Sequence, residues 1–269
     1  MSTRPLSMAA GIMPEATPAQ LIEAAVSSGH DLGGMWVEQD DWSDAVTRAV
    51  RKQLSDSGLK LLDVEVAWIK PGDPDPWLEQ LVDIAAELGS PNLLCVSSDP
   101  EDASTAAKLQ RLLDRAKGTG VRINLEFGLF TEVKSIGQAR AIVDRLDGTG
   151  KGILCDTLHW SRSGGTAQAI ADLPGEWVGY AQLCDAPAAG PDLEDMDDII
   201  EDAVDRRMAM GRGGLDIAAM LSALPADLPV SVEERSAALR KNFPDLNDRA
   251  REVARTSRAW LAQHDNSDV

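Results

Sequence analysis

The sequence predicts an α/β protein whose single domain is a closed (β/α)8 barrel. Eight short apolar runs rich in β-forming residues alternate with segments of helical periodicity, and the first seven runs start roughly 24 to 32 residues apart. That interval is the size of a strand–helix–strand unit. A doubly wound open sheet is the rival fold, but no G-x-G-x-x-G follows the first run and no Walker A motif occurs. We therefore expect one barrel over residues 1–269.

Each apolar run is expected to form a strand, and each segment between two runs a helix. The helix TPAQLIEAAVSSG has clear ends, because Thr17 can cap it, Pro18 suits its first turn and Gly29 can stop it. The segments PWLEQLVDIAAELG and TAAKLQRLLDRAKGTG have apolar residues at helical spacing and also end at glycine. The eight expected strands are LSMAAG from Leu6, HDLGGMWV from His30, KLLDVEVAWI from Lys60, NLLCVSS from Asn92, RINLEFG from Arg122, KGILCDT from Lys151, WVGYAQLCD from Trp177 and LPVSVEE from Leu228.

The connection between the last two strands is longer than the others. It contains eight acidic residues between Asp192 and Asp205. Such a run is compatible with a solvated helix that has a charged outer face. The alternative is an extended loop and helix, about 186–214, that covers the barrel mouth, since the loops at that end of a barrel carry its chemistry. The polar tail after Gln263 is expected to fray.

Composition limits the classes of function. The net charge of -18 disfavours binding to nucleic acid or to an anionic membrane, because both repel an acidic surface. The three cysteines, Cys95, Cys155 and Cys184, are scattered, which indicates reduced thiols in a cytoplasmic protein. No apolar run approaches the length of a membrane span, and no signal peptide is recognised. We expect a cytoplasmic protein whose partner is a small polar substrate, with a homo-oligomer left open.

Oxygen-bearing side chains occur where four of the late strands end. Each follows apolar residues, so several carboxylates would meet at one barrel mouth and repel one another. A divalent cation would resolve this repulsion, and an all-oxygen ligand set suits Mn²⁺ or Mg²⁺ better than Zn²⁺, with Co²⁺ or Zn²⁺ as further options. In the alternative interpretation, each carboxylate caps the next helix or pairs with an arginine. The four expected ligands are Glu126, Asp156, Gln182 and Glu233.

Other polar and aromatic residues are expected around the same mouth. His159 follows Asp156 by three residues and could polarise a carbonyl, orient a hydroxyl or enter the metal shell, although a lone histidine is usually structural. Trp36, Trp68 and Trp160 are placed at strand ends, where a substrate wall and core packing are equally compatible. The remaining candidates for substrate binding are Arg162 in its glycine-containing loop, Glu65, Arg207 and Asp185.

The segments NLEFG, CDTLHWSRSGG, YAQLCDAP and LPVSVEERS together resemble the xylose-isomerase-like TIM barrels, a superfamily that includes sugar-phosphate isomerases and epimerases, ketose 3-epimerases, inosose dehydratases and endonuclease IV. The resemblance implies one catalytic divalent metal held by Glu126, Asp156, Gln182 and Glu233, with His159 at the substrate. Gln182 stands where the epimerases usually have histidine. Met210 and Arg212 in MGRGGLD replace a proline and an acid of the related loops. Endonuclease IV itself is disfavoured, since it needs a histidine-rich zinc cluster and a basic surface.

The chemistry implied is proton transfer next to a carbonyl through a metal-stabilised enediolate, with Glu126, Glu233 and His159 as catalytic residues. Return of the proton gives an epimer or an isomer, and loss of a β-hydroxyl gives a dehydratase or lyase. We expect an isomerase or epimerase of a sugar, sugar phosphate or related polyol ketone, with the dehydratase or lyase as the alternative. Two other classes stay open: a non-catalytic barrel subunit and a metal-dependent phosphate-ester hydrolase.

Overall fold

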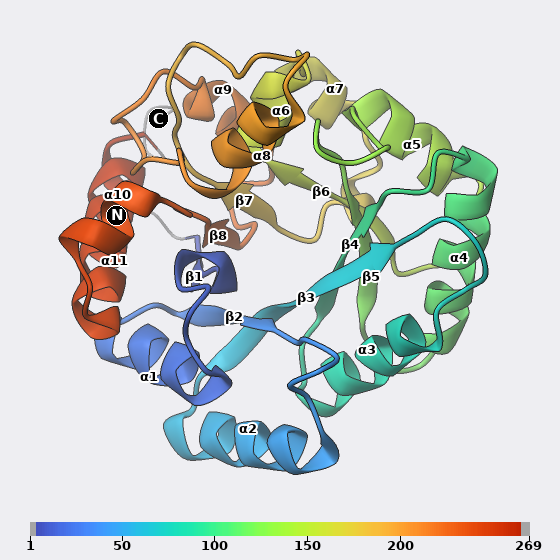
Figure 1. Ribbon diagram of the computed structural model, residues 1–269, viewed down its shortest axis with the longest axis horizontal. Coiled ribbons are helices and arrows are strands. Elements are labelled where there is room, and N and C mark those ends of the chain that lie inside the picture. Colours follow the sequence, from blue (N-terminus) through green and yellow to red (C-terminus); the bar gives the residue numbers. More distant parts are fainter. Residues whose placement is uncertain (1–3, 265–269) are drawn as a thin grey trace.

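The structure, a computed structural model, describes residues 4–264, and in this part of the chain eight parallel strands close into one barrel in chain order (Figure 1). Each strand pairs with its neighbour in sequence, and β1 pairs with β8. The predicted fold class is therefore confirmed. The strands are β1 Leu6–Met8, β2 Leu32–Trp36, β3 Lys60–Ile69, β4 Asn92–Ser97, β5 Arg122–Glu126, β6 Lys151–Asp156, β7 Ala181–Leu183 and β8 Val230–Val232.

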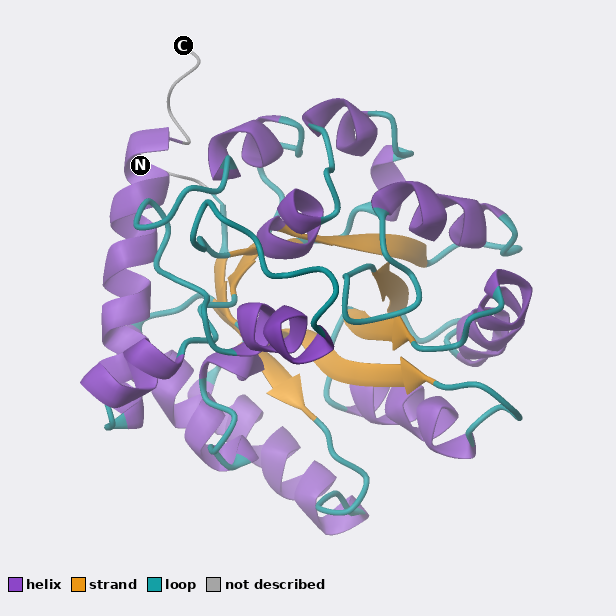
Figure 2. Cartoon of the chain, turned by 45° about the horizontal axis from the view of Figure 1, so that its top comes forward, coloured by secondary structure: helices purple, strands orange, loops and turns teal. Residues whose placement is uncertain are grey.

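The helices surround the strands on the outside (Figure 2). Their apolar faces pack against the outer face of the barrel in one large core. No helix in residues 4–264 combines the length and the apolar character needed to cross a membrane. The helices are α1 Pro18–Ser28, α2 Asp44–Ser57, α3 Pro76–Glu87, α4 Asp102–Arg115, α5 Ile136–Asp144, α6 Thr157–Arg162, α7 Ala167–Ala171, α8 Met196–Val204, α9 Ile217–Ser222, α10 Ala237–Asn242 and α11 Leu246–His264, with 3-10 turns at Ala10–Ile12 and Gly175–Trp177.

The ends of α1 confirm the capping prediction. The Thr17 hydroxyl accepts the Gln20 N–H, and the Gln20 side chain in turn accepts the Thr17 N–H. These contacts form a capping box, which satisfies two N–H groups that lack a partner within the helix. Gly29 ends the helix at φ 73°, in the left-handed conformation that glycine adopts without steric cost.

The seventh strand is shorter than predicted. The run from Trp177 was expected to be extended throughout, but its start forms a 3-10 turn and only Ala181–Leu183 pairs as strand. Trp177 instead packs in the outer core, where the Lys151 ammonium lies 5.0 Å from its ring centroid. Pairing thus begins only where the chain enters the barrel wall. The eighth strand likewise starts two residues later than expected, at Val230.

The long connection after β7 lies over the barrel. Asp185 and Met208 pair through both of their backbone N–H groups, so the segment leaves and returns at one point. Between them, α8 presents Met196, Ile200 and Val204 to the cavity at the barrel mouth. The structure therefore places this part of the predicted covering segment over the site. The predicted fraying of the tail concerns residues that lie mostly outside those described.

Candidate active site

The four predicted oxygen ligands lie at one rim of the barrel. Glu126 and Asp156 are the last residues of β5 and β6, Gln182 lies within β7, and Glu233 directly follows β8. Asp156 pairs in register with Gln182. Because the carboxyl ends of parallel strands meet at one face of a barrel, the local sequence brings these side chains together. The exposed fractions of Glu126, Asp156 and Gln182 are 5%, 0% and 1%.

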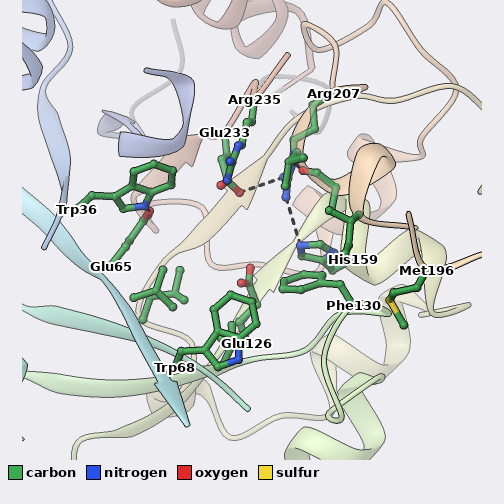
Figure 3. A pocket seen from close by; sticks show the side chains of 16 residues that line it. Trp36, Glu65, Trp68, Glu126, Phe130, His159, Met196, Arg207, Glu233 and Arg235 are labelled. Carbon is green, nitrogen blue, oxygen red and sulfur yellow. Dashed lines mark hydrogen bonds and ion pairs between the residues drawn. The ribbon is translucent and has the colours of Figure 1, made fainter. Parts of the chain in front are cut away.

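A cavity of about 570 Å³ opens at this rim. Its volume lies in the range of sites that hold small organic ligands, roughly 300–1,000 Å³. Leu94 and Val96 of β4 belong both to this cavity and to a second, smaller core cluster, which therefore forms its floor. Figure 3 shows the charged side chains converging from several strand ends. The predicted site residues that line the cavity are Trp36, Glu65, Glu126, His159, Arg207 and Glu233.

Arg207 is the central cation of the site. Its Nη1 lies 2.7 Å from Asp156 Oδ2 and 3.0 Å from Glu233 Oε2, and its Nη2 donates to His159 Nε2 at 3.2 Å (Figure 3). Its Nε donates to the Ala203 carbonyl at the end of α8. The side chain is 3% exposed, so these contacts are shielded from water. The covering segment thus supplies the positive charge that holds two of the carboxylates.

Asp156 also caps a helix. Its Oδ1 accepts the N–H groups of Leu158 and His159 at 2.9 and 3.1 Å, and so caps the N-terminus of α6. Burial opposes ionisation of Asp156, but the Arg207 cation, His159 and the capping N–H groups hold the pKa of this carboxyl below its ordinary value. Asp156 therefore does both things that the alternative interpretation named, capping and arginine pairing, while lying in the predicted ligand position.

The pKa values of three other carboxyls at the site are shifted in the opposite direction, upward. Burial, followed by the negative charge of Asp156 and of Glu233, raises the pKa of Glu126 well above its usual value. Burial likewise raises the pKa of Glu65, and Asp63 adds to this. The pKa of Glu233 is raised by burial and partly lowered again by Arg207. Burial therefore makes all three of these acids harder to ionise than a carboxyl in water.

Two buried oxygen atoms at the rim have no hydrogen-bond partner among residues 4–264: Glu126 Oε1 and Gln182 Oε1. Gln182 is oriented by its amide Nε2, which donates to Glu65 Oε1 at 3.1 Å, while Glu65 Oε2 accepts the Trp36 indole N–H at 2.7 Å. Buried polar atoms are normally paired, so these two oxygens lack an electropositive partner. With Asp156 and Glu233 they form an all-oxygen donor set, which suits a hard divalent cation.

In the described residues no group of three or more His, Cys, Asp or Glu side chains forms a ready metal cluster. The Arg207 guanidinium contacts both Asp156 and Glu233. The donor set nevertheless fits a divalent ion in its chemistry, since two of its oxygens are unpaired and the others already hold a cation.

His159 lies in the cavity wall as a neutral ring. Burial lowers its pKa to about 4, partly offset by Asp156. Its ring centroid is 5.1 Å from that of Phe130, at an interplanar angle of 49°. Because Arg207 can only donate, His159 Nε2 accepts that hydrogen bond. A neutral imidazole held in this way can position a substrate group without carrying charge of its own.

Three predicted substrate-binding residues are not at the cavity. Arg162 pairs with Asp202 at 2.8 Å and donates to the Pro187 carbonyl, so it fastens α6 to the covering segment. Trp160 is 5% exposed and belongs to the outer core. Asp185 accepts the backbone N–H groups of three residues in the loop that follows Arg207: Gly211, Gly213 and Leu215. All three residues therefore make contacts within the protein, and their predicted role in substrate binding stays a prediction.

Replacing Asp185 with alanine is expected to lower the free energy of unfolding by about 1–3 kcal/mol, because buried N–H groups lose their acceptor. Denaturant unfolding measures this, with Asp227→Ala, an exposed aspartate, as the control. A raised KM at unchanged stability would contradict the anchoring role and restore the substrate-binding prediction.

Several cavity residues were not predicted from the sequence. Phe130 follows Glu126 by four residues, and Arg235 follows Glu233 by two, so proximity to a predicted ligand is the signal that could have found them. Met196 and Ile200 come from α8, where the acidic run obscures the apolar face. Trp68, one of the strand-end tryptophans named from the sequence, also lines the cavity and is absent from the buried core.

Asp63 lies on β3, two residues before Glu65, and is completely buried. Neither of its carboxyl oxygens has a hydrogen-bond partner in the described residues. Burial raises its pKa from 3.8 to about 7. The nearby Tyr180 hydroxyl lowers the pKa of Asp63, although it forms no hydrogen bond of normal geometry. The negative charge of Glu233 raises this pKa further. The barrel interior therefore contains an acid that titrates near neutrality.

This shift predicts how the stability of the metal-free protein depends on pH. Because the pKa of Asp63 is higher in the folded than in the unfolded chain, its stabilising contribution is complete below pH 3.8 and is lost as the pH rises through about 7. Asp63→Asn is expected to be more stable than the wild type at about pH 8 and to lose less stability between about pH 5 and 8. Urea unfolding in the presence of a chelator measures the stability at each pH. Asp41→Asn, at an exposed aspartate, is the control. Equal pH slopes for wild type and Asp63→Asn would contradict the assignment.

Comparison with known proteins supports the assignment of the fold and of the family. A family model described as a xylose isomerase-like TIM barrel matches residues 22–264. A 3-dehydroshikimate dehydratase of Pseudomonas aeruginosa is 30% identical over 258 residues, 87% of this chain and 39% of the relative. The chain thus spans well under half the length of that relative.

Two solved structures show the same fold. One, the IolI protein with a binding zinc atom, has a TM-score of 0.80 at 17% identity and covers 97% of this chain and 99% of its own. The other is a D-allulose 3-epimerase from Methylomonas sp., with a TM-score of 0.68 at 17% identity over 97% of this chain and 98% of its own. With a family model that matches nearly the whole described barrel, the chain belongs to the xylose isomerase-like TIM barrel family.

Proposed function

We propose that the protein is a divalent-metal-dependent dehydratase that removes a proton next to the carbonyl of an oxygenated small molecule and expels a β-hydroxyl as water. The observation that carries the proposal is the set of oxygens at the barrel rim, in which Glu126 Oε1 and Gln182 Oε1 are buried and unpaired among the described residues. Buried oxygens of this kind call for a cation. Glu126, which carries one of them, also lines the cavity where a substrate would bind.

The residues that would hold the metal are Glu126, Asp156, Gln182 and Glu233. A bound divalent ion would supply Lewis acidity, which stabilises negative charge on a carbonyl oxygen during proton removal. The IolI protein, which has the same fold, is described with a binding zinc atom, so a barrel of this fold can hold a metal. The oxygen donors of this chain favour Mn²⁺ or Mg²⁺.

The remaining roles follow from this chain's own side chains. Glu126 and Glu233 both line the cavity and are the candidates for accepting the proton from carbon, once a cation has lowered their raised pKa values. Glu65 lies beside them with a pKa raised well above normal, so it can give a proton to the departing hydroxyl. The proton leaves carbon, the C–O bond breaks and one water is released. Neutral His159, held by Arg207, orients a substrate oxygen.

The relative that aligns over most of this chain is a 3-dehydroshikimate dehydratase, and this similarity favours dehydration over epimerisation. The epimerase neighbour supports the fold alone at its level of identity. Epimerisation or isomerisation is the second candidate, because Glu126 and Glu233 both face the cavity and two carboxylates can serve removal and return of a proton.

The test is proton NMR in D₂O with purified protein, Mn²⁺ and a panel of 3-dehydroshikimate, inososes and ketoses. We expect loss of water from at least one cyclic hydroxy-ketone. Deuterium exchange next to the carbonyl without elimination would overturn the dehydratase and favour the epimerase. If no compound of the panel reacts with Mn²⁺, Mg²⁺, Co²⁺ or Zn²⁺ present, both the dehydratase and the epimerase would be contradicted.

A further inference from the structure

One side of the cavity is apolar and faces the charged side. Ten of the sixteen lining residues are hydrocarbon or aromatic side chains. Figure 3 shows Trp68 and Phe130 across the cavity from Glu233, Arg207 and Arg235. A compact, fully hydroxylated substrate would leave this side in contact with water. The ten are Trp36, Val66, Trp68, Leu94, Val96, Phe130, Met196, Ile200, Ala203 and Val204.

Trp68 is held in place although much of it is exposed. Trp68 is 41% exposed, yet its indole N–H donates a hydrogen bond to Ser98 Oγ at 2.7 Å. Its ring meets Phe130 edge-on, with centroids 6.0 Å apart and an interplanar angle of 68°. An aromatic face fixed at both ends and left open to a cavity is a preformed surface for a flat apolar group.

The helix α8 extends this surface. Met196 and Ile200 are four residues apart, so they share one helix face, and they are 49% and 43% exposed. Both line the cavity, whereas the buried Ile199 does not and anchors the helix. Large exposed apolar side chains that gather around a concave site indicate a binding surface. We call Trp68, Phe130, Met196 and Ile200 the apolar wall.

The charged side contains a second arginine, Arg235, which feels the charge of Glu233 but forms no ion pair within residues 4–264. The Arg235 guanidinium lies 5.2 Å from the ring centroid of Trp36, and in the described residues its buried Nε has no hydrogen-bond partner. Arg207, by contrast, is already paired with Asp156 and Glu233. A planar guanidinium that lines the cavity and stacks on an indole suits a carboxylate.

We infer that the substrate is an amphipathic carboxylate, with its carboxylate at Arg235 and a ring or branched hydrocarbon portion on the apolar wall. The inference rests on the proposed function only in that both use the same cavity. It narrows the substrate from polyol ketones in general to hydroxy-carbonyl acids that carry an apolar part.

Binding of probe molecules tests the inference without any reaction. Isothermal titration calorimetry would compare benzoate and cyclohexanecarboxylate with gluconate, which lacks the apolar part, and with benzyl alcohol, which lacks the charge. We expect the first two to bind at least about tenfold more tightly than the last two, since each missing part removes one set of contacts. Gluconate binding as tightly as benzoate would overturn the inference.

Substitutions test the contact with the apolar wall and the contact with Arg235 separately. Ile200→Ser and Trp68→Ala are each expected to weaken benzoate binding by about five- to tenfold. Arg235→Gln is expected to abolish the preference for benzoate over benzyl alcohol. Val26→Ser is the matched control for Ile200→Ser, because Val26 is 45% exposed on α1 and does not line the cavity. Equal benzoate affinity in Ile200→Ser, Trp68→Ala and Val26→Ser would place the probe elsewhere and overturn the inference.

Failure of this inference can be told apart from failure of the proposed function. Protein that binds benzoate on the apolar wall but takes up no metal and converts no substrate keeps the inference and loses the proposed dehydratase. Protein that is metal-dependent but prefers gluconate keeps the chemistry and loses the amphipathic substrate.

Discussion

Glutamine in place of Glu126 or Glu233 is expected to lower kcat/KM by about 10²–10⁴-fold, the usual contribution of a positioned acid–base group. Each substitution keeps the shape of the side chain but removes the charge that binds a cation and accepts a proton. Both residues line the cavity and lie at strand ends of the same rim, so each change acts directly on the reacting centre. Steady-state kinetics on whichever substrate the NMR panel identifies provides the measurement.

The two variants should remain folded. Glu126 is buried among like charges that raise its pKa, so the neutral amide removes a repulsion in the metal-free state. Glu132→Gln is the matched control, since Glu132 is an exposed residue of the loop that follows β5. Activity that survives in both Glu126→Gln and Glu233→Gln would show that the carboxylates are not the catalytic groups.

Arg207→Gln is expected to lower the free energy of unfolding of the metal-free protein by about 3–5 kcal/mol, because it leaves two buried carboxylates without their shared counter-ion. Arg207 is 3% exposed and lies 2.7 Å from Asp156 and 3.0 Å from Glu233. A divalent ion can replace the missing positive charge, so Mn²⁺ should raise the melting temperature of Arg207→Gln more than that of the wild type.

The neighbouring arginine provides the control. Arg206 pairs with Asp198 and Glu201 at the surface, with an exposed side-chain fraction of 35%. Arg206→Gln should therefore change the free energy of unfolding by no more than about 1 kcal/mol. If chemical denaturation gave equal losses for the two variants, Arg207 would not be the counter-ion of the site.

The barrel and the rim carboxylates could be predicted because they rest on local patterns. Alternating apolar runs and capped helices such as α1 specify the strand–helix repeat. Glu126 and Asp156 end apolar strands, and the topology of a parallel barrel brings such residues to one face. Their position therefore follows from sequence periodicity without knowledge of side-chain contacts.

The contacts of the arginines could not be predicted in this way. Arg162 and Arg207 both follow polar segments, yet Arg162 pairs with Asp202 and Arg207 enters the cavity. The difference depends on how the segment after β7 folds back on itself, which is set by the long-range pairing of Asp185 with Met208. Met196 and Ile200 of the apolar wall were missed for the same reason, because they lie within an acidic run and reach the cavity only through tertiary packing.

The proposed chemistry depends on one divalent cation bound by the rim oxygens. The most direct test is metal content by inductively coupled plasma mass spectrometry, on protein purified without chelator and again after dialysis against Mn²⁺. We predict about one ion per chain in the wild type and none in the Glu126→Gln/Glu233→Gln double variant. Protein that stays metal-free after Mn²⁺, Mg²⁺, Co²⁺ and Zn²⁺ are each supplied would contradict the claim. The Arg207-paired carboxylates would then be the complete site, and a non-catalytic barrel would become the leading interpretation.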